Sequence, residues 1–373
     1  MKPLQLALIR QRYTPFGGAE RFVSRAMDAL KAQGASITLL TREWEGGGDA
    51  LICDPFYLGS LWRDWGFARC VCRTLARHNF DLVQSHERVS CCDIYRAGDG
   101  VHREWLAQRG RVLGPLRRFG VWLNPYHRYT LGAERRLFAS PQLKAVICNS
   151  RMVKAEIMRH FGVAEDKLHV IYSGVDLEAF HPRLKETYRL PVRTQLGIPG
   201  HATLFLFVGS GFERKGLAAA LRALPPAAYL AVAGHDRRAR DYSRLAAQLG
   251  IAERVRFLGP QQDVKPYYGA ADALVLPTLY DPFPNVALEA LACGLPVVTS
   301  TQCGAAELLA ETGLVVDALD TDALGAAMTA LLDKNHRSAL SEQARRLASE
   351  YGLQAMADNL LRLYGELMPR AGV

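Results

Sequence analysis

Short apolar segments alternate with segments of helical periodicity along almost the whole chain, and this alternation restricts the possible folds more than any other feature. Apolar runs at 4–9 and 35–41 predict strands, and the amphipathic pattern of 19–33 predicts a helix between them. Strands joined by helices form parallel sheets through right-handed crossovers. Further strands are predicted at 81–86, 144–150, 168–175, 203–209, 229–234, 254–259, 271–277, 296–300 and 313–317. The chain is therefore expected to be an α/β protein.

The alternation is interrupted once, and the interruption predicts a domain boundary. Residues 176–200 are rich in proline and charge, and we predict an inter-domain linker there. With 373 residues, of which 49% are hydrophobic, the chain is long enough for two domains with their own cores. We predict domains at 1–178 and 179–351, with a C-terminal helix at about 352–373 packing back on the first. Two Rossmann-like domains would face each other across a central cleft, since ligands bind at the carboxyl ends of such strands.

The cysteines and the N-terminal segment both predict a cytoplasmic protein. The apolar run at 4–9 is too short for a signal peptide, and no segment approaches the ~18 apolar residues of a transmembrane helix. No cysteines form a CxxC pair, so we expect reduced core side chains rather than disulfides or metal ligands. The eight are Cys53, Cys70, Cys72, Cys91, Cys92, Cys148, Cys293 and Cys303.

The first candidate site is FGGAER, residues 16–21, which follows the first predicted strand. Gly17 and Gly18 permit a tight turn and let a ligand approach the backbone, and Glu20 begins the next predicted helix. The segment is not a GxGxxG fingerprint, so it does not predict a dinucleotide site. From the residues alone, a ligand-binding turn and an ordinary turn with a capping carboxylate are both open.

A second glycine-rich loop, VGSGFERKG at 208–216, follows a predicted strand of the second half. Backbone amides from Gly209 onward, a helix N-terminus and the cations Arg214 and Lys215 together suit a diphosphate. The GxxxxGK[ST] pattern of P-loop proteins does not occur in this loop. The alternative interpretation is an exposed basic pair without a ligand.

The third candidate, YDPFPNVALEALACGLPVV at 280–298, holds two carboxylates eight residues apart. Asp281 lies in a proline-rich loop, and Glu289 lies inside the helix predicted for 285–293. Both side chains are predicted to point into one cleft near the positive N-terminus of that helix. A carboxylate commonly binds the vicinal hydroxyls of a ribose. The alternative is a solvated helix carboxylate.

Together these segments resemble glycosyltransferase family 4, which has the GT-B architecture. The resemblance spans nearly the whole chain and rests on GGAE, on SGVD at 173–176, on GSGFERKG, and on the acidic-x7-Glu segment ending in EALACGLPVV. Within the family it is greatest to the lipopolysaccharide core glucosyltransferase I group. It implies retaining sugar transfer from a nucleotide donor, here UDP-glucose, without a bound metal or other cofactor. The DTD at 320–322 is accordingly predicted to cap a helix at 320–332.

The resemblance also implies roles for individual residues. Arg214 and Lys215 would hold the donor diphosphate, and Glu289 would bind the ribose hydroxyls. Asp281, where the family usually has Glu, would contact the hydroxyls of the donor sugar, and its shorter side chain leaves the identity of that sugar open. Gly17, Gly18 and Gly209 would approach the donor, with Glu20 nearby, and the backbone amides of Phe283, Asn285 and Val286 would line the sugar side.

Polar residues in SHERVSCCDIYRAGDG, 85–100, follow a predicted strand of the first half. In similar enzymes a His or Asp here faces the donor sugar or the acceptor hydroxyl. Asp99 is our first candidate for the acceptor side and His86 our second, although a histidine at a strand end is often a structural hydrogen-bonding group. No carboxylate nucleophile is evident, so we favour front-face attack, in which the leaving diphosphate takes the acceptor proton. The predicted catalytic residues are Asp99, His86, Glu20 and Asp281.

Residues 101–136 carry eight arginines and two glutamates, a local charge of +6 within the chain's total of +9. Aromatic side chains are interleaved with these cations, a pattern typical of an anionic membrane surface and also of nucleic-acid binding. A packed helical hairpin is a third possibility. Because lipopolysaccharide core enzymes have a membrane-binding segment in this region, the resemblance favours the membrane. The predicted contacts are Arg103, Trp105, Arg111, Arg117, Arg118, Phe119 and Trp122.

The sequence thus predicts a retaining hexosyltransferase that acts on a lipopolysaccharide core or a similar membrane glycolipid. It would be peripheral on the inner face of the bacterial inner membrane, with no nucleic-acid partner. One alternative is a family 4 transferase for another sugar in capsule or O-antigen synthesis. A second is a non-enzymatic basic protein that binds membrane or RNA.

Overall fold

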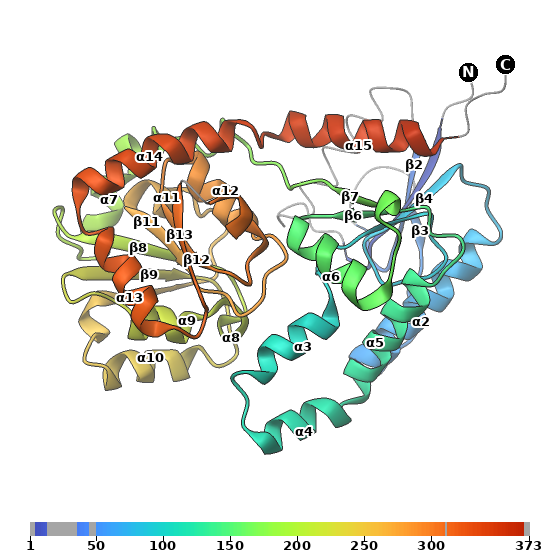
Figure 1. Ribbon diagram of the computed structural model, residues 1–373, viewed down its shortest axis with the longest axis horizontal. Coiled ribbons are helices and arrows are strands. Elements are labelled where there is room, and N and C mark those ends of the chain that lie inside the picture. The colour runs from blue at the N-terminus through green and yellow to red at the C-terminus, as the bar shows by residue number, and fades with distance from the viewer. Residues whose placement is uncertain (1–3, 13–35, 45–49, 310–311, 369–373) are drawn as a thin grey trace. The chain divides into compact units, whose positions relative to one another are not determined.

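The computed structural model describes residues 4–12, 36–44, 50–309 and 312–368, which form two compact units (Figure 1). The first unit comprises Met1–Tyr172 together with Met356–Val373, and the second comprises Ser173–Ala355. Each unit is built on one sheet whose neighbouring strands are parallel. Because helices connect the strands, the predicted α/β class with two Rossmann-like units is confirmed.

The sheet of the first unit has the order β3-β2-β1-β4-β5-β6-β7. The direction of the chain order reverses between β1 (Gln5–Ile9) and β4 (Leu82–Ser85), and such a switch point is where open parallel sheets bind ligands. The other strands are β2 (Ser36–Thr41), β3 (Ala50–Ile52), β5 (Ile94–Arg96), β6 (Ala145–Cys148) and β7 (Leu168–Val170).

Helices of the first unit cover this sheet and extend from it. The hydroxyl of Ser150 accepts a hydrogen bond from the backbone N–H of Val153 at 3.2 Å and caps the helix that follows, and Gly162 is the C-cap of that helix. The C-terminal helix is tied to the sheet through Tyr364, whose hydroxyl donates to the side chain of Gln84. The helices are α2 (Gly59–Leu75), α3 (His102–Gly110), α4 (Pro115–Leu123), α5 (Pro125–Phe138), α6 (Arg151–Phe161) and α15 (Leu353–Leu367), with a 3-10 turn at Glu165–Lys167.

The sheet of the second unit has the order β10-β9-β8-β11-β12-β13 and reverses between β8 (Thr203–Val208) and β11 (Ala273–Leu276). All six side chains of β8 are buried, as expected for a strand covered on both faces. The remaining strands are β9 (Ala228–Ala233), β10 (Val255–Gly259), β12 (Val297–Ser300) and β13 (Gly313–Val316). The helices are α7 (Leu184–Gln195), α8 (Phe212–Lys215), α9 (Leu217–Arg222), α10 (Ala239–Gln248), α11 (Lys265–Ala270), α12 (Asn285–Ala292), α13 (Thr321–Ala330) and α14 (Lys334–Ser349), with 3-10 turns at Ala252–Arg254 and Gly304–Leu308.

The predicted strands are confirmed with small shifts in their ends, except that only Leu168–Val170 of the strand predicted at 168–175 is formed. The helix predicted at 19–33 lies outside the described residues. Asp320 caps α13 by accepting a hydrogen bond from the N–H of Ala323 at 2.9 Å, which confirms that interpretation of the DTD segment. Strands β3 and β5 and helix α2 were not predicted. Both strands are only three residues long, too short to show a period in the sequence.

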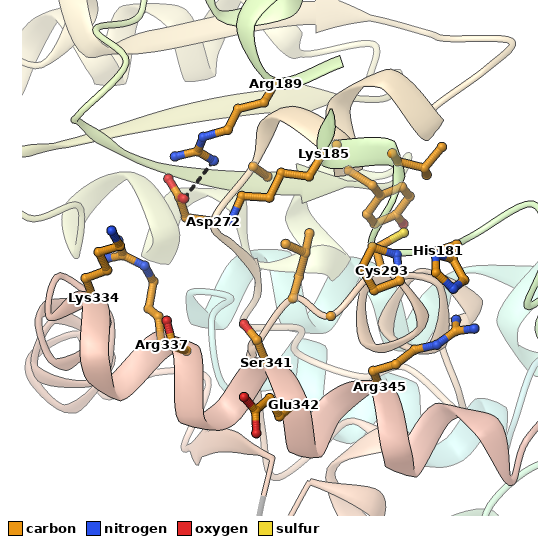
Figure 2. Close-up of a pocket in the computed structure, with 18 of the residues that line it drawn as sticks. His181, Lys185, Arg189, Asp272, Cys293, Lys334, Arg337, Ser341, Glu342 and Arg345 are labelled. Atoms are coloured by element: carbon orange, nitrogen blue, oxygen red, sulfur yellow. Dashed lines mark ion pairs between the residues drawn. The ribbon is translucent and has the colours of Figure 1, made fainter. Parts of the chain in front are cut away.

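The linker predicted at 176–200 is wrong, because most of that segment is folded into the second unit. Helix α7 occupies its centre, and the side chain of Arg193 is 1% exposed. The guanidinium of Arg193 donates to the carbonyls of Ala270 and Ala202 and to the carboxylate of Asp272. Asp272 also forms an ion pair with Arg189, which Figure 2 shows. A charge pattern that suggested solvent exposure therefore belongs to a buried ion-pair cluster.

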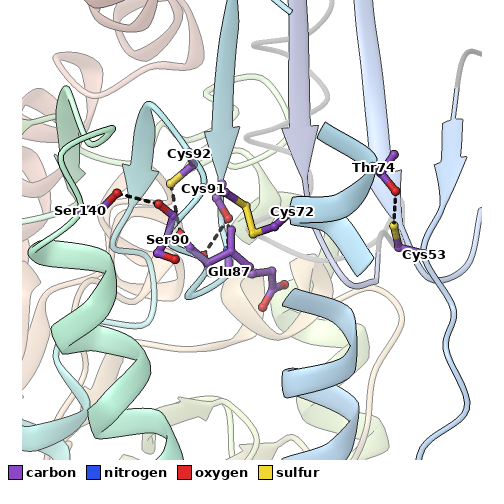
Figure 3. The surroundings of a disulfide bond; sticks show 10 residues. Cys53, Cys72, Thr74, Glu87, Ser90, Cys91, Cys92 and Ser140 are labelled. Atoms are coloured by element: carbon purple, nitrogen blue, oxygen red, sulfur yellow. Dashed lines mark hydrogen bonds between the residues drawn. A yellow bond between two sulfur atoms is a disulfide. The ribbon is translucent and has the colours of Figure 1, made fainter. Parts of the chain in front are cut away.

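The prediction that all eight cysteines are reduced is also wrong. Cys72 in α2 and Cys91 in the loop after β4 form a disulfide, with 5.7 Å between their Cα atoms (Figure 3). The two lie 19 residues apart, and nothing in the local sequence pairs them. The other six are free, and all of these except Cys70 are buried.

Candidate functional site

The loop after β8 doubles back toward the end of β11, at the switch point of the second sheet. Gly209 has φ +151°, and a Cβ there would lie 3.1 Å from Cε of Lys215. Gly216 has φ +79°, and a Cβ there would overlap the carbonyl oxygen of Pro277, just beyond β11. Both positions therefore require glycine, and their close packing brings the predicted diphosphate-binding cations to the carboxyl edge of the sheet.

A side chain from the next strand supports the same loop. The carboxylate of Asp236, after β9, accepts a hydrogen bond from the backbone N–H of Phe212 at 2.7 Å. The N–H of His235 donates to the hydroxyl of Ser210 at 3.1 Å. The ends of three strands that are neighbours in the sheet, β9, β8 and β11, thus hold the loop in one conformation. Asp236 was not among the residues predicted for the site.

Arg214, Lys215 and Asp281 form one ion-pair cluster. Nη1 of Arg214 lies 3.2 Å from Oδ2 of Asp281, and the ammonium of Lys215 donates to the same oxygen. The side chains of Lys215 and Asp281 are buried, whereas that of Arg214 is 37% exposed. Burial alone would raise the pKa of Asp281, but the two cations hold that pKa below its ordinary value, so the carboxylate is ionised.

The cluster leaves one carboxylate oxygen of Asp281 for other use. Both ion pairs engage Oδ2, and within the described part of the chain Oδ1 accepts no hydrogen bond. The backbone of Asp281 is fixed by hydrogen bonds with Gln302 and Gly304, at 3.0 and 2.8 Å. A rigid carboxylate beside two cations can bind a hydroxyl while the cations bind an anion.

Glu289 is buried in α12, and its carboxylate has a hydrogen-bond partner that was not predicted from the sequence. Its Oε2 accepts a hydrogen bond from the hydroxyl of Tyr268, in α11, at 2.9 Å. The same hydroxyl lies 3.3 Å from the carbonyl oxygen of Val286. Of the other predicted donor residues on this segment, Phe283 is buried and Asn285 is the first residue of α12. The expected meeting of Glu289 with Asp281 stays a prediction, since each is held by different neighbours.

In the first unit, His86 follows β4 at the switch point of that sheet. It is buried, and Nε2 of its ring lies 3.0 Å from the side-chain nitrogen of Gln84. Its backbone N–H donates to the carbonyl of Ile9 at 3.0 Å. Burial, with the charges of Arg96 and Arg10, lowers its pKa well below the ordinary value. His86 is therefore neutral near pH 7 and able to accept or donate one hydrogen bond.

Asp99 lies in the turn after β5 and is 71% exposed. Its nearest cation is Arg88, at 3.7 Å, and Arg88 donates to buried Glu134 at 3.0 Å. Glu134 also accepts a hydrogen bond from the N–H of His102 at 2.8 Å. Asp93 is bonded to Lys144 and to the N–H of Val83, as expected of a satisfied structural group.

Glu87, next to His86, is a titratable residue that was not among those predicted for the site. Its Oε1 accepts a hydrogen bond from the N–H of Gln11, at the end of β1, at 3.0 Å. Burial raises its pKa to about 7, although that hydrogen bond and Arg10 act in the opposite direction. Groups that titrate near neutral pH at a switch point are candidates for proton transfer. The sequence did contain a signal for Glu87, because in the segment SHER it directly follows His86, the last residue of a predicted strand.

The predicted residues Gly17, Gly18 and Glu20 lie outside the described residues. Within the described ranges, no group of three or more His, Cys, Asp and Glu side chains is arranged to hold a metal ion.

The basic segment 101–136 folds into the three helices α3, α4 and α5. Helix α4 has no buried residue, and Leu116, Phe119 and Trp122 are 89%, 58% and 69% exposed. The rings of Phe119 and Trp122 stack with centroids 5.8 Å apart. Arg103, Arg111, Arg117 and Arg118 are exposed, whereas Trp105 is half-buried. An exposed apolar and basic helix of this kind is uncommon on a protein that contacts only water.

Comparison with known proteins shows the family and the fold of this chain. A family model described as Glycosyltransferase Family 4 matches residues 16–179, and one described as Glycosyl transferases group 1 matches 190–347. A D-inositol 3-phosphate glycosyltransferase of Rhodococcus opacus is 32% identical, over 80% of this chain and 70% of its own length. The chain belongs to glycosyltransferase family 4. It is therefore a transferase enzyme, as predicted.

Two further comparisons concern lipopolysaccharide and the fold of this glycosyltransferase. The lipopolysaccharide glucosyltransferase WaaG of Escherichia coli K12 is 26% identical, over 95% of this chain and 96% of its own. The crystal structure of WaaG matches with a TM-score of 0.82, over 96% of this chain and 99% of that one. Anabaena Alr3699/HepE in complex with UDP-glucose matches at a TM-score of 0.73 with 18% identity, over 97% of this chain and 99% of that one. The fold is the GT-B fold.

In the described residues of this glycosyltransferase, no helix is both long and apolar enough to cross a membrane.

Proposed function

We propose that this enzyme transfers glucose from UDP-glucose to a lipopolysaccharide core, or a similar membrane glycolipid, with retention of the anomeric configuration. The observation that carries the proposal is the full-length similarity to WaaG, which is named a lipopolysaccharide glucosyltransferase. The ion-pair cluster after β8 and β11 supports a donor with a diphosphate, because two cations meet there at one edge of the sheet.

In this proposal, Arg214 and Lys215 bind the donor diphosphate and Asp281 binds a hydroxyl of the sugar through Oδ1. Glu289, oriented by Tyr268, binds the ribose hydroxyls. The backbone amides of Asn285 and Val286 line the sugar side, because the first N–H groups of α12 have no partner within their own helix. The amide of Phe283, in the loop before α12, is assigned to the same side by the family resemblance.

The transfer step is proposed as front-face attack. The acceptor hydroxyl oxygen bonds to the anomeric carbon while the bond from that carbon to the diphosphate oxygen breaks, and the hydroxyl proton passes to the departing diphosphate. Arg214 and Lys215 stabilise the charge on the leaving group, so the step needs no metal. Gly17, Gly18 and Glu20 are assigned to donor binding. Asp99 is the first candidate for the residue that contacts the acceptor hydroxyl, and His86 is the second.

Helix α4 and its neighbours are proposed to bring the enzyme to the cytoplasmic face of the inner membrane. Exposed arginines attract anionic headgroups, and exposed Phe119 and Trp122 suit the headgroup level. A lipid-linked acceptor is available only there, so attachment raises the encounter rate with the substrate.

The test is a calorimetric titration with UDP-, GDP-, ADP- and dTDP-glucose and with UDP-galactose, followed by transfer to purified lipopolysaccharide core and to inositol 3-phosphate. UDP-glucose is expected to bind most tightly, and NMR of the core product should show an α-linkage. A β-linkage would contradict retention. Transfer to inositol 3-phosphate alone would overturn the acceptor.

A further inference from the structure

A second cationic cavity lies in the second unit, at the opposite edge of the sheet from the donor cluster. Its volume is about 700 Å³, within the range of small-molecule sites. It is lined by residues that precede strands: His201 before β8, Asp272 before β11 and Leu295 before β12. Lys215 and Asp281, by contrast, follow the carboxyl ends of β8 and β11. The two sites therefore share no charged residue.

Cations outnumber anions in the cavity walls. Figure 2 shows Lys185 and Arg189 on one side and Lys334 and Arg337 along α14 on the other. Among the lining residues, six are Lys or Arg and two are acidic, and the cations are Lys185, Arg189, Lys334, Arg337, Arg345 and Arg346. Like charges gathered in one cavity raise the free energy of the empty protein, and a bound anion lowers it.

Part of this charge is used for structure, and part is not. The guanidinium of Arg345 donates to the carbonyl of Ala292 at 2.8 Å, and that of Arg337 donates to the carbonyl of Leu332 at 2.9 Å. These bonds fix the ends of α12 and α13. The side-chain ammonium groups of Lys185 and Lys334 make no ion pair or hydrogen bond with the described residues, so they are available to a ligand.

Asp272 does not neutralise the positive charge of the cavity wall. Its Oδ2 accepts hydrogen bonds from Arg193 and from the N–H of Leu204, at 2.5 and 2.8 Å. Nη1 of Arg189 lies 2.9 Å from Oδ1 of Asp272, yet that buried nitrogen makes no hydrogen bond within the described part of the chain. Two guanidinium groups thus share one carboxylate. Burial and the charge of Arg189 lower the pKa of Lys185, as expected where cations are crowded.

The cavity also has an apolar wall. Pro182, Leu184, Leu295 and the ring of Tyr268 line it. Ammonium and guanidinium groups beside an apolar wall suit a ligand with phosphate groups on an organic body. We propose that this cavity binds a small phosphorylated metabolite, at a site separate from the donor site. Tyr268 belongs to both regions, since it lines the cavity and donates to Glu289.

The test is calorimetric titration of the full chain with inorganic pyrophosphate, with citrate as a non-phosphate polyanion. Because the donor site also suits pyrophosphate, each titration is repeated in Lys215→Met. The cavity variant is Lys185→Ser with Lys334→Ser. The matched control removes two exposed cations elsewhere, Arg237→Ser with Arg240→Ser. Thermal melts establish that every variant folds.

In the Lys215→Met background, pyrophosphate is expected to bind, and the cavity variant should weaken that binding by about tenfold or more, the effect of losing two charge-assisted contacts. The control should leave it within about twofold. Absence of binding in Lys215→Met, or equal weakening by cavity and control variants, would overturn the site. Citrate binding as tight as pyrophosphate would overturn the phosphate preference. None of these results depends on which sugar the enzyme transfers.

Discussion

The ammonium of Lys215 and the carboxylate of Asp281 form a buried ion pair across 66 residues of sequence. The pair joins the glycine-rich loop after β8 to the loop after β11, and both loops lie at the reversal point of the sheet. It holds two like-charged side chains, those of Lys215 and Arg214, in one place before any anion binds. The proposed diphosphate site is therefore formed in advance of its ligand.

Lys215→Met should reduce transfer by more than about tenfold at saturating donor, because a charge-assisted contact to the leaving diphosphate is worth ~1.5–3 kcal/mol. It should also lower the free energy of unfolding, by less than the ~3–5 kcal/mol of a broken isolated buried pair, since Arg214 still pairs with Asp281. Urea melts and initial rates measure the two effects.

The double variant Lys215→Met with Asp281→Asn separates these effects. It should regain part of the lost stability, because the buried charge of Asp281 is removed together with its partner Lys215. It should stay inactive. Near-wild-type turnover in Lys215→Met would contradict the assignment of the donor site.

Glu289→Ala should reduce transfer by more than about tenfold if the carboxylate binds the donor ribose. Tyr268→Phe removes only the hydroxyl that donates to Glu289, so a smaller loss is expected, about 0.5–1.5 kcal/mol and mainly in the KM for the donor. Steady-state kinetics with varied UDP-glucose distinguish the two. An effect of Tyr268→Phe on kcat alone would argue against a positioning role.

The alternation of strands and helices made the fold predictable, because buried parallel strands such as β8 are continuous apolar runs. The segment 176–200 was misjudged for a related reason. Its charges and prolines are typical of exposed chain, yet Arg193 is buried against Asp272, 79 residues away, and Pro191 lies inside α7. Long-range ion pairs leave no local pattern.

The site was predictable where chemistry concentrates in short motifs, and not where single side chains from other elements complete it. Arg214, Lys215 and Asp281 lie in two motifs and meet in the structure. Tyr268 contributes through one hydroxyl from α11, and no motif marks it. The disulfide between Cys72 and Cys91 is of the same kind, because only the packing of α2 beside the loop after β4 brings the sulfurs together.

Glu87 should make stability fall as pH rises through the acid and neutral range. Its pKa is about 7 in the folded protein against an ordinary value of 4.5, so between these pH values the unfolded state loses its proton first. Stability from this group is full below pH 4.5 and is lost as pH approaches 7. The loss is at most about 3.5 kcal/mol, at about 1.4 kcal/mol for each unit of pKa shift, and partial exposure of the side chain reduces it.

Glu87→Gln tests this effect, because a glutamine oxygen can still accept the hydrogen bond from Gln11 without titrating. Urea melts from pH 5 to 7.5 should show the variant gaining on the wild type as pH rises. Glu350→Gln, at an exposed carboxylate, is the control and should follow the wild type. Parallel curves for Glu87→Gln and the wild type would contradict the raised pKa.

Transfer should continue in the presence of EDTA, because Arg214 and Lys215 supply the positive charge that a metal ion supplies in other nucleotide-sugar enzymes. The measurement is the initial rate with and without chelator, using enzyme prepared free of added metal. Loss of turnover that magnesium or manganese restores would contradict the proposed mechanism.

The basic helices should bind anionic membranes through exposed side chains. Replacing Arg111, Arg117 and Arg118 by Ser should release the protein from vesicles of phosphatidylglycerol and phosphatidylcholine, since each cation near an anionic surface contributes roughly 1 kcal/mol. Co-sedimentation at low and physiological salt measures this, and binding of the wild type should weaken as salt screens the charges. Donor binding should be unchanged, because the donor cluster belongs to the second unit.

A triple variant of equal charge change, Arg222, Arg237 and Arg240 to Ser, is the control, and its three arginines are exposed in the second unit. It should stay bound if position rather than total charge matters. A further variant, Phe119→Ser with Trp122→Ser, removes the stacked exposed pair and should weaken binding even at high salt, because burial of apolar area is not screened. Equal binding to neutral and anionic vesicles, or release by the control triple variant, would remove the membrane role from α4 and leave it as a surface for the acceptor.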